Sequence, residues 1–322
     1  MEPDGPAHLR DGAAEMLAPE HNRSGVAGDV QPLAQNDEGE SGARPIGSIG
    51  IWSGGAIDIG TQDAITNRAK ITATSTGLSG GADIKLTEAI TVGLGGGYGN
   101  DLSRIARDAA RVRSHSKMIA AYASLMPVPG AFLDAMIGKG DLSFRVRRLV
   151  TDNGATAIGR RDGDFLVGAL SAGIDRRGDN FAWSLYGRSE VLDATLDTYA
   201  ESGANRFNLR LDERRLTSVT GTLGGRLEWQ KLFSFGKAMP RARAEWNHEF
   251  ADADAQWLDY ADIPGSALYK IETQGWSREQ FQLSLGSRFL LPELWSFDFE
   301  AAFRGSSGES SGSVRAQLAK EF

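Results

Sequence analysis

The stretch AITVGLGGGYGND, residues 89–101, holds five glycines within the seven consecutive residues 93–99. A glycine-rich turn that binds dinucleotide phosphates follows the spacing G-x-G-x-x-G and opens a helix. When this spacing is counted from the glycine at position 93, 95 or 97, its last position falls on Tyr98, Asn100 or Leu102. The Lys-Ser or Lys-Thr pair of a phosphate-binding loop does not follow either. The spacing therefore argues against a nucleotide site.

The same stretch alternates with a period of two, which is the period of a β-strand. One face would be apolar and end in an aromatic ring, whereas the other would carry almost no side chains. The apolar face consists of Ile90, Val92, Leu94, Gly96 and Tyr98, and the other face of Thr91, Gly93, Gly95, Gly97 and Gly99. This pattern predicts a strand whose odd-numbered glycines face a crowded interior. Because these glycines carry no side chains, they leave room for an inserted segment to pass close to the strand.

The composition excludes several classes of protein. The chain has 322 residues, enough for one large β-barrel or two average domains. Its net charge of −7 argues against a nucleic-acid partner, which favours a basic surface. The absence of cysteine excludes disulfides, thiolate catalysis and thiolate metal ligands, and it suits a chain that crosses an oxidising periplasm. Neither a metal nor a cofactor is predicted.

Residues 1–43 differ from the remainder of the chain. They begin with the acidic sequence MEPDGP, which lacks the apolar core of a signal peptide. The protein is therefore expected to be either cytoplasmic or the C-terminal part of a longer precursor. Residues 7–18 have a short helical pattern, and residues 36–42 are polar and rich in glycine. We predict a linker with a short helix over residues 1–43 and one domain over residues 44–322.

The best candidate for a transmembrane helix is residues 118–138, close to the roughly 20 residues that such a helix needs. This stretch contains Pro127, Pro129 and Gly130, which would break a helix. It also contains Asp134, which would place a charge in the membrane. Two strands joined by a tight turn fit it better. The sequence therefore argues against a helical membrane protein.

From residue 44 onward the period of two recurs up to the C-terminus, which favours β-strands throughout. Short turns, as at residues 127–130, alternate with longer polar connections, as at residues 101–110. An even number of strands with alternating short and long connections is typical of an outer-membrane barrel. We therefore predict an all-β fold, a twelve-stranded antiparallel transmembrane barrel, with strands near residues 45–60, 68–85, 88–100, 111–127, 130–148, 157–175, 180–198, 207–230, 240–252, 268–290, 295–305 and 311–322.

The chemistry of the two strand faces favours lipid over water as the surroundings of this barrel. In a soluble β-sandwich the apolar faces would pack against each other in a core, and alternation alone is compatible with that fold. Here the apolar faces tend to end in Trp, Tyr or Phe, as an interfacial girdle requires. The opposite faces carry charges that are predicted to line a hydrated pore: Arg188, Arg226, Arg241, Arg243, Glu245, Glu249, Asp298, Glu300, Arg304 and Arg315.

Seven blocks carry a family resemblance by their order and spacing: IAAYASLMPVPGAFLD (119–134), GRRDGDFLVGAL (159–170), LYGRSE (185–190), YAESGA (199–204), TGTLGGRLEW (220–229), PRARAEWNHEF (240–250) and VRAQLAKEF (314–322). With these blocks, residues 44–322 resemble the C-terminal translocator domain of autotransporters, the type V secretion proteins of Gram-negative bacteria. In that family the barrel inserts in the outer membrane, among its lipids, and brings an N-terminal passenger to the cell surface.

The resemblance implies further features of this chain. In the family a helix passes through the pore, so residues 7–18 are a candidate for the plug or the passenger junction, with an ordinary extension as the alternative. The barrel-assembly machinery and periplasmic chaperones are the implied partners besides the chain's own passenger segment. The resemblance implies neither a catalytic activity nor a cofactor.

The family's last strand ends in an aromatic residue that is recognised during insertion. By this resemblance Phe322 is the insertion signal, and Leu318, Ala316 and Val314 share its strand face by alternation. Lys320 departs from the pattern, because an apolar residue is usual two positions before the end. A lysine near the membrane interface can extend its ammonium group to water.

Two other functions are alternatives. A barrel without a passenger would serve as an outer-membrane channel or adhesin. An enzymatic barrel, a protease or lipase, would need a catalytic cluster, and the candidate is His248 followed by Asp252, Asp254, Asp259 and Asp262. A solvated loop whose acids oppose aggregation explains these residues better, so no catalytic residue is predicted.

Overall fold

A computed structural model describes residues 45–64, 69–234, 236–252, 255–272, 278–307 and 309–321. The predictions for residues 1–43 and for Phe322 lie outside these residues. Within them the helices are the short 3-10 turns η1 (Ala106–Asp108), η2 (Asn205–Phe207) and η3 (Pro292–Leu294). No helix among the described residues is long and apolar enough to cross a membrane.

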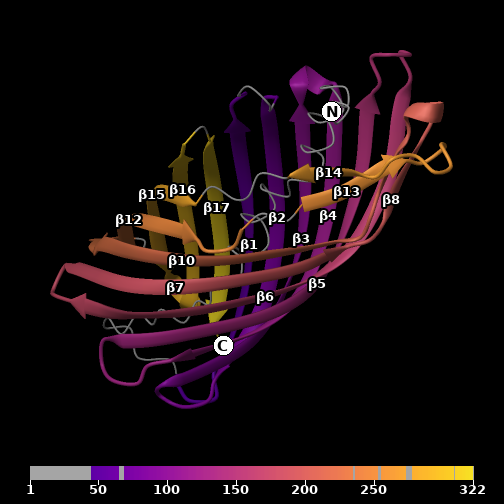
Figure 1. The fold of residues 1–322 in the computed structure, drawn as a ribbon. Coiled ribbons are helices and arrows are strands. Elements are labelled where there is room, and N and C mark those ends of the chain that lie inside the picture. Colours follow the sequence, from indigo (N-terminus) through magenta and orange to yellow (C-terminus); the bar gives the residue numbers. More distant parts are fainter. Residues whose placement is uncertain are drawn as a thin grey trace.

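One antiparallel sheet that closes on itself makes up the wall of the molecule (Figure 1). Each long strand pairs with the next, and the last pairs with the first from Gly50↔Glu321 to Gln62↔Glu309. The predicted twelve-stranded antiparallel barrel is thereby confirmed in the described part of the chain. Its strands are β1 (Ile49–Gln62), β2 (Ile71–Lys85), β3 (Ile90–Ile105), β4 (Ala110–Leu125), β5 (Ala131–Leu149), β6 (Thr156–Arg177), β7 (Phe181–Leu196), β10 (Arg214–Trp229), β12 (Gly236–Glu249), β15 (Glu279–Leu291), β16 (Trp295–Ser306) and β17 (Glu309–Glu321).

Four short strands of the same sheet, called here the rim sheet, lie at one end of the barrel. They are β8 (Tyr199–Ser202), β9 (Leu209–Leu211), β13 (Ala255–Tyr260) and β14 (Tyr269–Glu272), paired in that order. β8 also pairs with the start of β6, so the rim sheet continues the wall beyond the end of β7. In Figure 1 it runs across the upper ends of β4 to β6, where its apolar side chains pack on Val112 and Val146. The short strand β11 (Lys231–Phe233) continues β10 and pairs with the first residues of β12 at the other end.

The rim sheet corrects two predicted strands. Alternation predicts one strand over residues 207–230 and another over 268–290, but β10 begins at Arg214 and β15 at Glu279. The first residues of both predicted strands pair within the rim sheet instead. Rim strands have the same period of two as wall strands, so alternation does not show where one strand ends and the next begins.

The two ends of the barrel differ in the length of their connections. Residues 126–130, 178–180 and 292–294 make short connections at one end, whereas residues 197–213 and 250–278 make long ones at the other. β1 starts at the short-turn end, because its residue Gly50 lies opposite Glu321 of β17. Everything N-terminal to β1 is therefore joined to the barrel at the short-turn end.

The outer face of the barrel is apolar. Large aliphatic side chains stand almost free on it, with exposed fractions of 69% for Leu94, 74% for Ile119 and 69% for Leu285. A soluble β-sandwich would cover such faces with a second sheet, and so large an apolar surface on a single sheet requires lipid. The exposed rings of Trp229 and Trp246 lie toward strand ends, where an interfacial girdle is expected.

Candidate functional site in the barrel lumen

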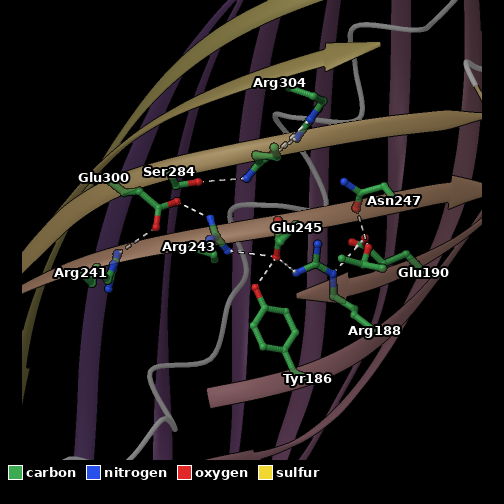
Figure 2. Close-up of polar contacts among 12 residues, drawn as sticks. Tyr186, Arg188, Glu190, Arg241, Arg243, Glu245, Asn247, Ser284, Glu300 and Arg304 are labelled. Atoms are coloured by element: carbon green, nitrogen blue, oxygen red, sulfur yellow. Dashed lines mark hydrogen bonds and ion pairs between the residues drawn. The ribbon is translucent and has the colours of Figure 1, made fainter. Parts of the chain in front are cut away.

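A chain of paired charges crosses the inner face of the barrel (Figure 2). At its centre Glu245 of β12, with a side chain 2% exposed, accepts a hydrogen bond from the Tyr186 hydroxyl at 2.5 Å. Its Oε1 lies 3.4 Å from Nη1 of Arg188 and 3.5 Å from Nη1 of Arg243. Arg188 also donates from Nε to Glu190 at 3.1 Å. Each buried charge thus has an opposite charge beside it, which offsets the cost of removing it from water.

The chain continues toward β16. Arg243 pairs with Glu300, whose other oxygen lies 3.4 Å from Nη2 of Arg241. Arg241 donates two hydrogen bonds to Asp298, at 2.5 and 2.7 Å, in the bidentate geometry that strengthens such pairs. Arg288 donates to the same carboxylate at 3.2 Å. We therefore call this set of residues on β7, β12, β15 and β16 the charged wall.

Small residues allow partners of the charged wall to meet across an intervening strand. Tyr186 of β7 is opposite Gly224 of β10, which is in turn opposite Glu245 of β12. A Cβ atom added to Gly224 would lie 2.4 Å from Cζ of Tyr186, so only glycine at this position leaves enough space for the Tyr186 ring. In the same way Gly286 of β15 separates Arg241 from Glu300.

The remaining residues predicted to line the pore also lie on the inner strand faces. Arg226 is 3.8 Å from Asp175. Glu249 accepts hydrogen bonds from the Ser218 hydroxyl and from the Val219 amide, both at 2.8 Å. The set is completed by Arg304, which donates to Gln282 at 2.8 and 3.1 Å, and by Arg315, which is opposite Glu300. Their role in a pore stays a prediction.

The opposite part of the lumen adds a buried apolar cluster to the polar interior that the sequence predicts, and Asp58 and Asp83 are buried there as well. Trp52 of β1, Met118 and Tyr122 of β4, Met136 of β5 and Phe165 of β6 form one buried cluster with their neighbours. We call this set the apolar wall. These large side chains fall on the inner parity of their strands, which also carries Gly, Ala, Ser and buried charges such as Asp58 and Arg161.

The glycines of residues 93–99 lie beneath the apolar wall. Nε1 of Trp52 donates to the Tyr122 hydroxyl at 2.7 Å, and the two rings, inclined at 56° to each other, lie close to β3. A Cβ atom on Gly93 would lie 2.3 Å from the Tyr122 ring, and one on Gly95 would lie 3.1 Å from Trp52. On Gly97 it would have ordinary contacts, at 3.7 Å or more. Much of the predicted room beside this strand is therefore occupied by the barrel's own aromatic rings.

The residues predicted to face the lumen are charged residues and glycines, so they do not include the inward rings of Trp52, Tyr122 and Tyr186. Parity could have found Trp52, which alternates in step with the buried Ala56 and Asp58 and out of step with the exposed Ile57. An aromatic ring on the polar parity of a barrel strand is thus a signal for an inward side chain.

The candidate catalytic cluster is not assembled in the described residues. His248 lies between Trp246 and Phe250 on the outer face, with Nδ1 2.7 Å from Oε1 of Glu279. No group of three or more metal-ligating side chains occurs in the part of the chain that the structure describes. Asp254 lies outside that part, and the other acids have separate partners: Arg278 for Asp252, Arg210 for Asp259 and Asn208 for Asp262.

The last strand presents an apolar outer face. Val314, Ala316 and Leu318 are exposed there, as alternation predicts. Lys320 on the same face places its Nζ 4.8 Å from the centre of the Trp295 ring, a cation–π contact that lets the ammonium group stay at the interface. The role of these residues as an insertion signal stays a prediction.

One buried carboxylate holds the rim sheet to the barrel. Glu201 of β8, whose side chain is 0% exposed, accepts a hydrogen bond from Nη2 of Arg148 at 2.5 Å. It also accepts from the Tyr199 hydroxyl at 3.2 Å and from the Leu209 amide at 2.9 Å. Beside it the apolar side chains of the rim sheet, Leu258 among them, pack on the upper ends of β4 and β5.

Replacing Glu201 with Gln should loosen the rim sheet without opening the barrel. The change leaves Arg148 without its counter-charge, a local loss of about 1–3 kcal/mol. We expect limited proteolysis within residues 197–213 to become roughly tenfold faster, because cleavage follows the population of the open form. Arg215→Gln is the control, since its guanidinium, 71% exposed, pairs with Asp193 outside the rim sheet. Equal cleavage rates for wild type and Glu201→Gln would contradict the expected result.

One family model and three solved structures point to the same family. Residues 51–302 match the family model of the autotransporter β-domain. The fold is similar to the translocator domain of the autotransporter NalP from Neisseria meningitidis, with a TM-score of 0.76, 15% identity and 98% and 100% of the two chains covered. It is also similar to the β-domain of the Bordetella autotransporter BrkA, with a TM-score of 0.61, 16% identity and 84% and 98% covered. The fold is similar as well to the transport unit of the autotransporter AIDA-I from Escherichia coli, with a TM-score of 0.58, 14% identity and 96% and 97% of the two chains covered. No curated protein sequence matches the chain.

A closed antiparallel barrel with a lipid-facing outer surface and a polar chain of charges inside defines an outer-membrane β-barrel. The family match covers most of the described wall, so this chain belongs to the autotransporter family, through its β-domain. It is a translocator barrel of the bacterial outer membrane, as the sequence resemblance implied.

Proposed function

We propose that the lumen is the path by which the segment N-terminal to β1 reaches the cell surface. That segment is joined at the short-turn end, because β1 begins beside the end of β17. In outer-membrane barrels short turns face the periplasm and long loops face the outside. A polypeptide has unsatisfied backbone groups in lipid, so the route around the barrel is unfavourable. The position where β1 begins is the observation that carries the proposal.

The two walls of the lumen suit a passing segment. In the charged wall the carboxylate of Glu245 and the guanidinium groups of Arg188 and Arg243 are already paired with each other. Paired charges offer little net attraction to the charges of a passenger. The apolar wall, with Trp52 and Phe165 at its centre, offers a surface to which an apolar stripe of a helix can pack. This deepens the proposed role of residues 7–18 as plug or junction.

In the proposed function the barrel performs no chemical step of its own. The separate partners of Asp252, Asp259 and Asp262 support this, since a hydrolytic site needs its groups within hydrogen-bond reach of one another. Insertion would use the outer face of β17, with Val314, Leu318 and Phe322 presented to the barrel-assembly machinery after periplasmic chaperones have delivered the chain.

The absence of cysteine allows a direct test by site-specific labelling. Glu2→Cys would be expressed with a cleavable export signal and exposed to a membrane-impermeant maleimide in intact cells. Thr151→Cys, on the connection between β5 and β6 at the long-loop end, and Val128→Cys, on the connection between β4 and β5 at the short-turn end, are the controls. We expect Glu2→Cys and Thr151→Cys to be labelled, and Val128→Cys to react only after the outer membrane is permeabilised. Labelling of Glu2→Cys only after permeabilisation would instead mean a channel or adhesin without transport of the N-terminus.

A further inference from the structure

Arginines are concentrated on the outer face of four neighbouring strands, at the long-loop end. They alternate in step with the lipid-facing Ile119 of β4 and Ile137 of β5, so they point away from the lumen. Five of the six are exposed and Arg111 is partly buried. We call them the arginine patch: Arg104 of β3, Arg111 and Arg113 of β4, Arg145 and Arg147 of β5, and Arg160 of β6.

The strand register places these arginines directly beside one another. Arg113 is opposite Arg145, and Arg145 is opposite Arg160, which gives one row across three strands. A second row joins Arg104, Arg111 and Arg147. Like charges directly opposite each other destabilise an antiparallel pair. Two such rows are therefore unfavourable for the barrel alone and point to an anionic ligand that separates the charges.

The protein itself neutralises only part of the patch. Arg111 pairs with Asp108 at 2.5 Å and Arg160 with Asp162 at 3.1 Å. Among the described residues Arg104, Arg113, Arg145 and Arg147 have no hydrogen bond or ion pair from their side chains. The hydrogen bond from Arg111, and then the charges of Arg111, Arg104 and Arg147, hold the pKa of the Asp108 carboxyl below its usual value. The excess of positive charge in the arginine patch thus lowers the pKa of a carboxyl at the tip of the β3–β4 turn.

The height of the patch matches a headgroup layer. On β4 the apolar outer face ends at Ile119, and Arg113 lies six residues closer to the long-loop end. Six strand residues span about 20 Å, or about 15 Å along the membrane normal at the usual barrel tilt. Lys117 and Lys139 are exposed between the apolar band and the arginines, in the layer where lipid phosphates begin. The basic side chains therefore rise from the edge of the lipid into the layer above it.

Among the described residues, the outer faces of β1, β2, β7 and β10 do not repeat this feature at the same end. The outer faces of β1 and β2 carry Thr61, Thr72 and Thr74 there. On β10 the exposed Arg215 is neutralised by Asp193 of β7, at 2.6 Å. Below the patch Asp141 and Asp164 are opposite each other, so the basic character is confined to the upper rows.

We propose that the arginine patch binds the phosphate and carboxylate groups of the glycolipid of the outer leaflet, lipopolysaccharide. Long loops face the outside, so this end of β3 to β6 stands in the outer leaflet and its headgroups. Guanidinium groups bind phosphate and carboxylate in a bidentate geometry, and adjacent arginines form several such pairs at once. Anions bound between the two rows attract the arginines on both sides and thereby offset the repulsion among them.

Binding can be measured with the full chain refolded in neutral detergent and fluorescently labelled lipopolysaccharide. The triple variant Arg113→Gln/Arg145→Gln/Arg160→Gln should bind about a hundredfold more weakly, at about fivefold for each basic residue beside an anionic membrane surface. The corresponding Arg→Lys triple should stay within a few-fold of wild type. Arg215→Gln is the matched control and should bind as wild type does. Dephosphorylated lipopolysaccharide should show a much smaller difference between wild type and the triple variant.

A second measurement separates this effect from a folding defect. Without lipopolysaccharide, the temperature at which the folded barrel loses its fast migration on an SDS gel should be equal or higher in the triple Gln variant, because repulsion is removed. With lipopolysaccharide, wild type should gain the larger increase, since the ligand binds its folded state more tightly. Equal affinities, or equal gains, for wild type and the triple variant would overturn the proposal. Surface labelling of Glu2→Cys should not change in the variant, so the proposal and the proposed translocation fail separately.

Discussion

Replacing Glu245 with alanine is expected to lower the stability of the barrel by about 3–5 kcal/mol, the usual cost of removing one partner from a buried ion pair. The change leaves Arg188 and Arg243 facing each other without the carboxylate that lies 3.4 and 3.5 Å from them. It also removes the acceptor of the Tyr186 hydroxyl. The measurement is the midpoint of thermal unfolding in detergent, followed by the loss of fast migration on an SDS gel.

Two variants show whether the charge is the cause. Glu245→Gln keeps the size of the side chain and an acceptor for Tyr186, so it should lose less stability than Glu245→Ala. Asp193→Ala removes the carboxylate from an exposed pair with Arg215 and should change stability by at most about 1 kcal/mol. A loss as small for Glu245→Ala as for Asp193→Ala would show that Glu190 and Glu300, the other partners of Arg188 and Arg243, neutralise these arginines without Glu245.

Replacing Gly93 with alanine is expected to destabilise the barrel by about 1–3 kcal/mol, the range found when extra atoms are forced into a packed interior. The new Cβ would lie 2.3 Å from the Tyr122 ring, which is held by its hydrogen bond from Trp52. Gly97→Ala, on the same strand face, has its nearest contact at 3.7 Å and should be almost neutral. Refolding yield and the unfolding midpoint of the two variants give the comparison.

A double variant identifies the ring as the cause. Tyr122→Ala removes the ring, so Gly93→Ala should cost much less in that background than in wild type, and the two effects should not add. Additive effects would mean that the backbone conformation of β3 requires glycine at position 93, and that the space for the Tyr122 ring is not the reason. Equal losses for Gly93→Ala and Gly97→Ala would contradict the packing described for the apolar wall.

The wall of the barrel could be predicted from the sequence because its signal is local. A period of two assigns each residue of a strand to one face, and the short turn at residues 126–130 separates two strands without ambiguity. The rim sheet could not be predicted in the same way. Strands as short as Leu209–Leu211 pair with residues far away in the chain, and nothing in three residues specifies such a partner.

The sequence predicts which face of its strand carries each residue of the candidate site, but it does not predict which of these residues contact each other. Parity placed Arg243, Glu245 and Glu300 on one side of their strands, and that is where they lie. Parity cannot say that Tyr186 reaches Glu245 across Gly224, because this depends on the absence of a side chain on a third strand. Contacts of this kind are fixed by register across several strands, which becomes definite only in the closed barrel.

The pairing of Gly50 with Glu321 brings together the two extremes of the described chain and sets an order of events in time. The seam between β1 and β17 needs residues 309–321, so it forms only after nearly the whole chain has been exported. Both edges of the sheet stay open until then. Open edges recruit other strands, and contacts of such high sequence separation form slowly. Until the seam forms the sheet encloses no passage, so the transport proposed for the N-terminal segment would begin only after β17 has paired with β1.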